Sequence, residues 1–140
     1  MPAGYSGTPL SKKLGLTDRT HLVVLAEPKE YEELLGSIPA GLTRQRDITA
    51  TTNVVHVFVT DRQTLARHLK ALRAALIPEA AVWVSWPKKS SKVPTDVTED
   101  VIRETALPLG FVDVKVCAVS DVWSALKLTV RKALRTQGAA

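Results

Sequence analysis

The sequence predicts a single α/β domain of three layers, in which helices cover both faces of a mostly parallel sheet that ends in a C-terminal antiparallel hairpin. Short apolar segments alternate with helical ones, which is typical of parallel strands joined by crossover helices. The segments over residues 21–26 and 54–59 carry almost no polar side chains, as expected of strands covered on both faces. The last two apolar segments, 111–119 and 122–132, are separated by two residues, which predicts an antiparallel pair.

Two helices are expected around the first strand. A short helix should cover residues 8–15, because the Thr8 hydroxyl can cap it and Gly15 can end it. After the strand, a second helix should run over residues 27–35, and Gly36 should end it.

The longest helix follows the strand at residues 54–59. A weaker, more polar strand at 42–48 precedes that strand and should lie near a sheet edge. Thr60 and Gln63 have the spacing of a capping box, in which each side chain satisfies a free backbone N–H. Leucine then recurs in steps of four, three and four, which places one apolar stripe against the sheet. These residues are Leu65, Leu69, Leu72 and Leu76.

A further strand at residues 81–86 leads into a polar loop at 87–94. Thr95 or Asp96 is expected to cap the helix after this loop, and Gly110 is expected to end it. The inward residues of this helix should be Val97, Val101, Ile102 and Leu107.

Length and composition fit one domain. A chain of 140 residues with 45% hydrophobic content can bury one core. We expect an arm and short helix over 1–19, the α/β domain over 20–134 and a disordered tail over 135–140. Cys117 is the only cysteine, and no segment has the character of a signal peptide or a membrane span. A cytoplasmic protein without a disulfide or a membrane contact is therefore expected.

The positive charge is modest and spread along the chain. The net charge is +5, with six basic and six acidic side chains in residues 1–50, seven and five in 51–100, and six and three in 101–140. Nucleic-acid binding usually shows a concentrated basic stripe, often with aromatic side chains for stacking. Trp83 and Trp86 should face opposite sides of one strand and so form no such platform. A nucleic-acid partner is therefore the weakest of the alternatives.

The second half of the chain resembles class I, Rossmann-like methyltransferases. Residues 72–84 are similar to their helix–turn–strand unit, and residues 111–132 to the hairpin that closes their sheets. Leu14-Gly15-Leu16 resembles their entry segment. The resemblance covers most of the chain and implies a truncated, methyltransferase-like sheet. In those enzymes the first strand leads into a glycine-rich loop that the cofactor, S-adenosylmethionine, approaches closely.

The junction after the first strand departs from that pattern. Residues 25–31 contain no glycine, and Pro28 removes a backbone N–H donor. Asp47 lies about 20 residues further on, where an acidic residue would meet a ribose, but without the loop it is a lone carboxylate. We therefore expect no cofactor, no S-adenosylmethionine binding and no catalysis.

Three stretches resemble the signatures of a small family of bacterial single-domain proteins, common in actinobacteria and classed as a domain of unknown function. They are GYSGTPL at residues 4–10, WVSWPKK at 83–89 and DVKVCAV at 113–119. Together they span the chain. The resemblance implies no particular activity.

The loop after the strand at 81–86 holds the best candidate site, for an anion. Ligands of open α/β sheets bind outside the carboxyl ends of the strands, and the next helix offers free N–H groups and its positive dipole end. Ammonium and hydroxyl groups there would bind a phosphate or a carboxylate. The candidate residues are Lys88, Lys89, Ser90, Ser91, Lys92 and Thr95. The alternative is a solvated surface loop whose three lysines extend into solvent or pair with Asp96, Glu99 and Asp100.

No catalytic residue and no metal site is expected. His21, His56 and His68 show no ligand spacing, and Cys117 has no second thiolate to join. His56 should be a satisfied core histidine, and Cys117 a small, partly buried hydrophobe rather than a nucleophile.

These observations favour a non-catalytic, methyltransferase-like binding or regulatory module. Its partner would be another protein or a further copy of the same chain. The alternative is a small-molecule enzyme or sensor that recognises a phosphate- or carboxylate-bearing ligand at the lysine loop (residues 88–92). A nucleic-acid-associated protein is the third. Fold alone does not choose between them.

Overall fold

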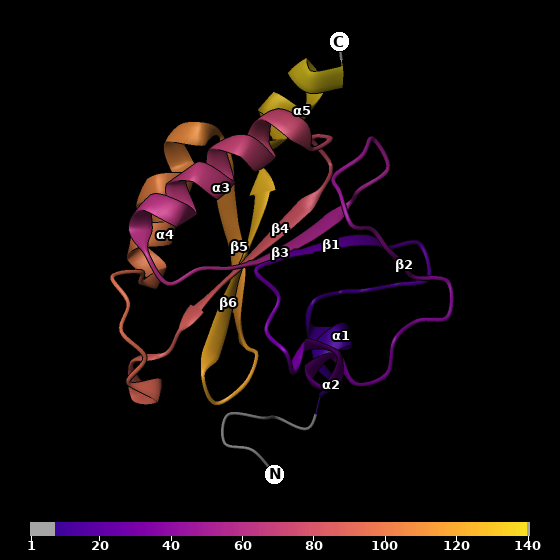
Figure 1. Ribbon diagram of the computed structural model, residues 1–140. Helices are drawn as coiled ribbons and strands as arrows, with labels where there is room; N and C mark the ends of the chain where they lie inside the picture. Colours follow the sequence, from indigo (N-terminus) through magenta and orange to yellow (C-terminus); the bar gives the residue numbers. More distant parts are fainter. Residues whose placement is uncertain (1–7, 140) are drawn as a thin grey trace.

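The computed structural model of this chain describes residues 8–139 and contains a six-stranded mixed sheet (Figure 1). The strand order is β2-β1-β3-β4-β6-β5. The first four of these strands run parallel, and β6 is antiparallel to both β4 and β5. The strands are β1 (His21–Leu25), β2 (Thr43–Arg44), β3 (Val54–Phe58), β4 (Ala81–Pro87), β5 (Phe111–Ala118) and β6 (Trp123–Val130). The predicted parallel sheet with a closing antiparallel hairpin is confirmed.

Helices cover both faces of the sheet, as predicted (Figure 1). One face carries α3 (Arg62–Ala75) and α4 (Glu99–Ala106), and the other carries the short α1 (Leu10–Lys13) and α2 (Tyr31–Leu35). The 3₁₀ helices are η1 (Lys89–Ser91), after β4, and η2 (Leu107–Leu109), after α4. Finally, α5 (Lys132–Ala139) runs through most of the segment for which the sequence predicts a disordered tail.

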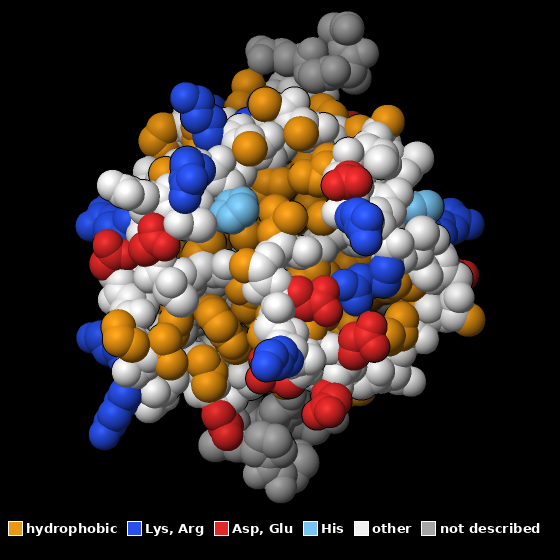
Figure 2. Space-filling view, in the orientation of Figure 1, with side chains coloured by type: hydrophobic (Ala, Val, Ile, Leu, Met, Phe, Trp, Pro, Cys, Tyr) orange, Lys and Arg blue, Asp and Glu red, His pale blue; other side chains and the backbone are white. Residues whose placement is uncertain are grey.

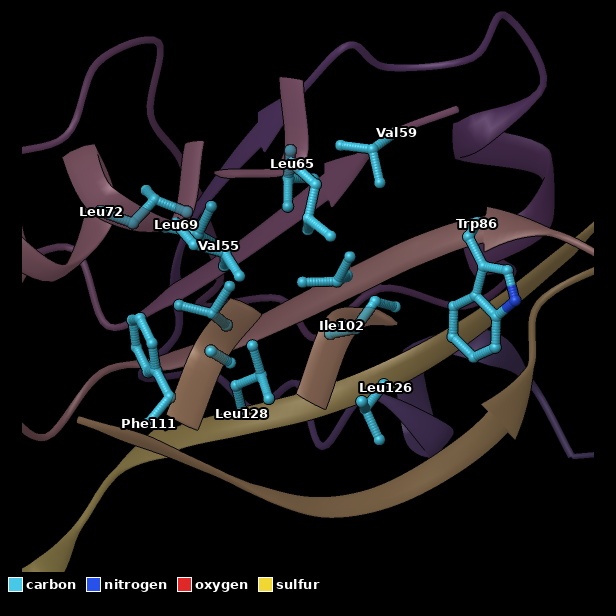
Figure 3. Close-up of a cluster of buried hydrophobic side chains, with 14 of the residues drawn as sticks. Val55, Val59, Leu65, Leu69, Leu72, Trp86, Ile102, Phe111, Leu126 and Leu128 are labelled. Carbon is cyan, nitrogen blue, oxygen red and sulfur yellow. The ribbon is translucent and has the colours of Figure 1, made fainter. Parts of the chain in front are cut away.

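Each face of the sheet has its own hydrophobic core. Beneath α3 and α4, valines and leucines of β3, β4 and β6 pack against the leucine stripe of α3 and against Ile102 (Figure 3). Beneath α1 and α2, the core contains Tyr31, Phe58 and Trp83. Trp86 belongs to the first cluster and Trp83 to the second, which confirms that these two rings face opposite sides of β4.

The caps of α1 and α3 differ from the prediction. Thr8 does not cap α1, because the residue that precedes this helix is Pro9, which has no side-chain cap bond. The cap of α3 is Asp61 instead of Thr60, and its carboxylate accepts a 2.9 Å hydrogen bond from the Thr64 N–H. Aspartate is among the strongest capping residues, so the helix begins one residue later than the capping-box spacing indicates.

The start and the end of α4 also differ from the prediction. Its cap is Thr98, whose hydroxyl accepts a hydrogen bond from the Val101 N–H, rather than Thr95 or Asp96. Leu107 is not inward-facing but 43% exposed, because the helix tightens there into η2. Prediction from spacing assumes one regular helix through these residues, and the change of helix type rotates the side chain outward.

Candidate functional site

The place where an open α/β sheet binds ligands lies between β1 and β3 in this fold. The chain passes from β1 to β2 on one side and then returns to β3 on the other side of β1. Ligands of such sheets bind outside the carboxyl ends of the strands where the order reverses in this way. Those ends are Leu25 and Phe58, and we call the space beyond them the switch-point crevice.

The chain leaves β1 through a left-handed turn at Ala26, whose φ is 57°. Glycine adopts this conformation readily, whereas a residue with a Cβ atom pays about 1–2 kcal/mol. The sequence contains no glycine there, so nothing in the pattern predicted this turn. Ala26 is followed by Glu27 and by Pro28, which has no N–H to offer a ligand.

An ion pair spans the carboxyl ends of β1 and β2. Arg44, the last residue of β2, donates a 2.5 Å hydrogen bond to the Glu27 carboxylate and lies 3.7 Å from the Glu32 carboxylate. Its guanidinium carbon also lies 5.7 Å from the centre of the Tyr31 ring, within the range of a cation–π interaction. The cation at the carboxyl end of β2 is therefore already partnered by this chain's own groups.

A buried polar cluster, Tyr31–His56–Ser85, lies beneath that ion pair. His56 Nδ1 is 2.9 Å from the Tyr31 hydroxyl, and His56 Nε2 is 2.7 Å from the Ser85 hydroxyl. All three side chains are completely buried. A neutral imidazole has one N–H and one lone pair, so it donates to one hydroxyl and accepts from the other. The prediction that His56 is a satisfied core histidine is confirmed.

Burial decides what this cluster can do chemically. It lowers the pKa of His56 to about 3 and raises the pKa of the Tyr31 phenol, so both groups are uncharged at neutral pH. The Ser85–His56 spacing would suit a nucleophile and its base, but Ser85 has no exposed surface at which a substrate could arrive. The cluster therefore holds α2 and two strands together.

Aromatic rings fill the space around His56. The Phe58 ring stacks on the imidazole at a centroid distance of 4.4 Å and meets the Tyr31 and Trp123 rings edge-on at 5.6 Å and 5.0 Å. These contacts join α2, β3 and β6, which are far apart in the sequence. Sequence reasoning placed His56 in the core, but it had no signal that would pair it with Tyr31 or Ser85.

The lysine loop follows β4 at the same edge of the sheet. The Lys88 N–H donates to the Val122 carbonyl at 2.7 Å, which ties the loop to the hairpin turn. The Ser91 hydroxyl donates to the Lys88 carbonyl at 2.6 Å and accepts from the Val93 N–H. Lys89, Ser90 and Lys92 are exposed. The loop is thus folded by its own backbone contacts, with lysines at its surface.

Thr95, the remaining residue of the predicted site, and its neighbour Asp96 form hydrogen bonds at the start of α3. The Thr95 hydroxyl donates to the Thr60 carbonyl at 2.6 Å, and the Asp96 carboxylate accepts from the Arg62 N–H at 2.8 Å. Glu99 and Asp100 both pair with Arg103. Within residues 8–139, none of the three loop lysines forms an ion pair, so they do not pair with these carboxylates there. Lys89 and Lys92 are exposed, as in the other form of the alternative, in which the lysines extend into solvent.

An open hollow of about 380 Å³ lies beside α1, apart from the lysine loop. The Ser11 hydroxyl donates to the Ser37 carbonyl at 2.5 Å in its lining, and Ile38 is 43% exposed. Sequence reasoning did not find it. It is lined by Pro9, Ser11, Lys12, Leu16, Ser37, Ile38 and Pro39.

Cys117 lies half-buried in β5 beside two lysines. Burial raises the pKa of its thiol, and Lys13 and Lys115 lower it by less, so the thiol is protonated at neutral pH. In the described part of the chain, no group of three or more His, Cys, Asp or Glu side chains could hold a metal ion. No helix there combines the length and the apolarity needed to cross a membrane. Figure 2 shows basic and acidic side chains interspersed over one face of the molecule.

No protein-family model and no curated protein matches this sequence. Several solved structures have a similar fold. LepI, in complex with SAH and a substrate analogue, is 10% identical with a TM-score of 0.58, over 94% of this chain and 49% of LepI. The mitomycin 7-O-methyltransferase MmcR is 13% identical with a TM-score of 0.53, over 87% and 52%. An NADB-Rossmann superfamily protein from Streptococcus agalactiae is 7% identical with a TM-score of 0.53, over 91% and 70%.

These similarities establish the fold, which is the Rossmann-like α/β fold of methyltransferases. This chain spans about half the length of LepI and MmcR. At such low identity the fold carries no activity with it. The resemblance to an actinobacterial family stays a prediction, and residues 4–7 of its first signature lie outside the described residues.

Proposed function

We propose that this chain is a methyltransferase-like binding module that does not transfer methyl groups. The observation that carries the proposal is that the chain's own side chains are paired at the carboxyl ends of β1 and β2 and buried beside β3. The Glu27–Arg44 ion pair spans the strand ends, and beneath it Tyr31 is fully buried. Two LepI structures contain SAH or SAM. In this chain, a nucleoside bound across the carboxyl ends of β1, β2 and β3 would have to displace these contacts.

Such displacement would be costly. Moving Tyr31 out would leave His56 Nδ1 buried without its hydroxyl partner, and a buried polar group that loses its partner costs about 1–3 kcal/mol. It would also remove the ring contacts of Tyr31 with His56 and Phe58. The turn after β1 would provide few new hydrogen bonds to the ligand, because Pro28 has no N–H donor.

The first prediction is that S-adenosylmethionine and S-adenosylhomocysteine do not bind. Titration calorimetry of the full chain should give no binding heat, since neither ligand finds an open crevice. A thermal-unfolding assay supplies an independent readout, because a ligand at about 100 times its dissociation constant stabilises a protein by about 2.7 kcal/mol. A micromolar dissociation constant for either ligand would overturn the proposal.

The lysine loop supports a second candidate function, the binding of a small anion. The observation that favours it is the presence of Lys88, Lys89 and Lys92 without ion-pair partners in the described chain, beside the exposed Ser90. We propose these four side chains as the ligand contacts. Ser91 and Thr95 would shape the loop, because their hydroxyls are already bonded to backbone carbonyls.

The second prediction concerns Lys88→Ala/Lys89→Ala. This double variant should weaken the binding of inorganic pyrophosphate at least about tenfold, because each lost ammonium removes a charge-assisted contact. Unfolding stability should change by only about 0.5 kcal/mol, as for other surface substitutions. Lys70→Ala, an exposed lysine on α3, is the matched control and should bind as the wild type does. Equal affinity for the wild type and the double variant would remove the loop as a site.

A further inference from the structure

Three arginines and a lysine lie together where α5 meets the end of α3. Figure 1 shows α5, which follows β6, beside the last turn of α3. Both helices reach Gly110, between η2 and β5: a Cβ atom there would lie 2.7 Å from Leu134 Cδ1 and 3.2 Å from Arg73 Nε, so the absence of a side chain lets both approach. The Arg131 N–H donates to the Gly110 carbonyl at 2.9 Å. We call this group the arginine corner: Arg73, Arg131, Lys132 and Arg135.

Two of the arginines are held by the backbone at this corner. Arg73 Nε donates to the Leu109 carbonyl at 3.0 Å, and Arg135 Nε donates to the Val130 carbonyl at 2.9 Å. Within residues 8–139, the terminal nitrogens of both guanidinium groups have no hydrogen-bond partner. Each group therefore keeps two nitrogens for a ligand, and its orientation is set before the ligand arrives. A side chain that is already held loses less conformational freedom on binding.

Acidic side chains leave the arginine corner with an excess of positive charge. No Asp or Glu occurs in α3, η2, β6 or α5, and Asp113 of β5 is bonded to Arg103. The acidic residues of α4 pair with Arg103 or with Arg62, which lies at the far end of α3. These residues are Glu99, Asp100 and Glu104. Glu79, exposed in the turn before β4, forms no ion pair in the described chain, and neither do the four cations.

We infer that the arginine corner binds the phosphate backbone of a nucleic acid. A guanidinium group matches two oxygens of one phosphate. The two held groups are bonded to different segments, η2 and β6, so they suit two phosphates of one strand, and the exposed Arg131 and Lys132 add further charge. Phosphate contacts read no base, so binding should not depend on sequence. Arg73 is far from the other three in the sequence, which is why charge spread along the chain did not indicate this cluster.

An acidic protein would offer carboxylates to the same groups, but the surroundings favour a nucleic acid. Protein interfaces are centred on apolar and aromatic side chains. In α3 and in residues 132–135 of α5 no large hydrophobic side chain is exposed, because Leu134 packs against the core. The exposed Leu107 of η2 is a single side chain and makes no apolar centre. Protein–DNA interfaces are instead polar and strongly basic.

The arginine corner is separate from the sites described above. It lies where β6 ends and β4 begins, whereas the switch-point crevice and the lysine loop lie at the carboxyl ends of the parallel strands. The inference is therefore independent of the proposed function, and its test uses no nucleoside cofactor.

Fluorescence anisotropy of the full chain with a labelled DNA duplex of about 20 base pairs tests the inference, and the dissociation constant should be about 1–100 µM near physiological salt. Four phosphate contacts predict a slope of about −3.6 for the logarithm of the association constant against that of the salt concentration. Scrambling the duplex sequence should leave both values unchanged. A chain that does not bind the duplex even at about 50 mM salt would overturn the inference.

Arg131→Ala/Lys132→Ala removes two exposed cations. It should weaken binding at least about tenfold at low salt and make the salt slope shallower by about 2, one for each lost phosphate contact. Lys88→Ala/Lys89→Ala removes the same charge at the other end of the strands and is the matched control, which should bind the duplex as the wild type does. Equal losses in the two variants would show that only net charge matters, and the inference would be wrong.

Arg73→Lys/Arg135→Lys separates the held guanidinium groups from their charge. Lysine keeps the charge but cannot contact two phosphate oxygens side by side, so the salt slope should stay while affinity falls at least about threefold. Circular dichroism would verify that the variant is folded. A variant that binds as tightly as the wild type would contradict the inference. So would polyglutamate that displaces the duplex at equal charge concentration, because the corner would then suit an acidic protein.

Discussion

Tyr31→Ala should lower the free energy of unfolding by about 3–5 kcal/mol, the loss typical of truncating a buried aromatic side chain. The Tyr31 ring is completely buried and contacts the His56 and Phe58 rings. Its hydroxyl is the partner of His56 Nδ1, which would remain buried and unpaired. Urea unfolding followed by fluorescence would measure the loss, with an unchanged denaturant slope as evidence of two-state unfolding.

Two further variants separate packing from hydrogen bonding. Tyr31→Phe keeps the ring and removes only the hydroxyl, so it should cost about 1–3 kcal/mol. Lys29→Ala, an exposed neighbour of α2, should stay within about 0.5 kcal/mol of the wild type. If Tyr31→Ala lowered the free energy of unfolding no more than Lys29→Ala does, Tyr31 would not fill the space beneath the ion pair. The proposal that the chain's own side chains exclude a nucleoside would then be wrong.

Stability should also fall steeply with acidification, because His56 is buried uncharged. Its pKa is lowered from 6.5 to about 3 in the folded chain by burial. Below pH 6.5 the unfolded chain therefore binds a proton that the folded chain does not. The stabilisation is complete above about pH 6.5 and is lost as the pH falls toward 3, at about 1.4 kcal/mol per pH unit.

Between about pH 6.5 and pH 4, the change in stability with pH reports on histidines rather than on the carboxyl groups of Asp61 and Asp113. The lowered pKa values of Asp61 and Asp113 act only below their ordinary value of 3.8. The pKa of His68 is also lowered, chiefly by partial burial, so His68→Gln is the control and should keep most of the slope. Tyr31→Phe/His56→Leu/Ser85→Ala removes every polar partner of the cluster together and should abolish the pH slope except for the smaller part due to His68. Urea unfolding at each pH would show an unchanged slope in this variant if His56 were not its source.

The sheet was predicted well from the sequence, because each strand and helix is indicated by a pattern of neighbouring residues. The apolar segments that became β1, β3 and β4 and the leucine stripe of α3 are periodic patterns within one element. Helix boundaries were less predictable, since neighbouring residues competed for the same role. Asp61, instead of Thr60, caps α3. The Thr95 hydroxyl donates a hydrogen bond to the Thr60 carbonyl and does not cap α4.

The site was the least predictable part, because its contacts join distant residues. His56 was correctly expected in the core, but its partners Tyr31 and Ser85 lie 25 and 29 residues away. Arg44 belongs to a two-residue strand whose pairing with β1 brings it to Glu27. No residue spacing in the sequence indicates these side-chain contacts. They follow from the strand order, which only the fold supplies.

The most direct test of the central claim is two-dimensional amide NMR of the full chain with S-adenosylmethionine added to saturating concentrations. The signals to follow are those of Ala26, Glu27 and Val59, which follow the carboxyl ends of β1 and β3 at the switch-point crevice. If the chain's own side chains fill that crevice, these three signals should not move. Saturable shifts of all three together would show a nucleoside bound between β1 and β3, and would contradict the account.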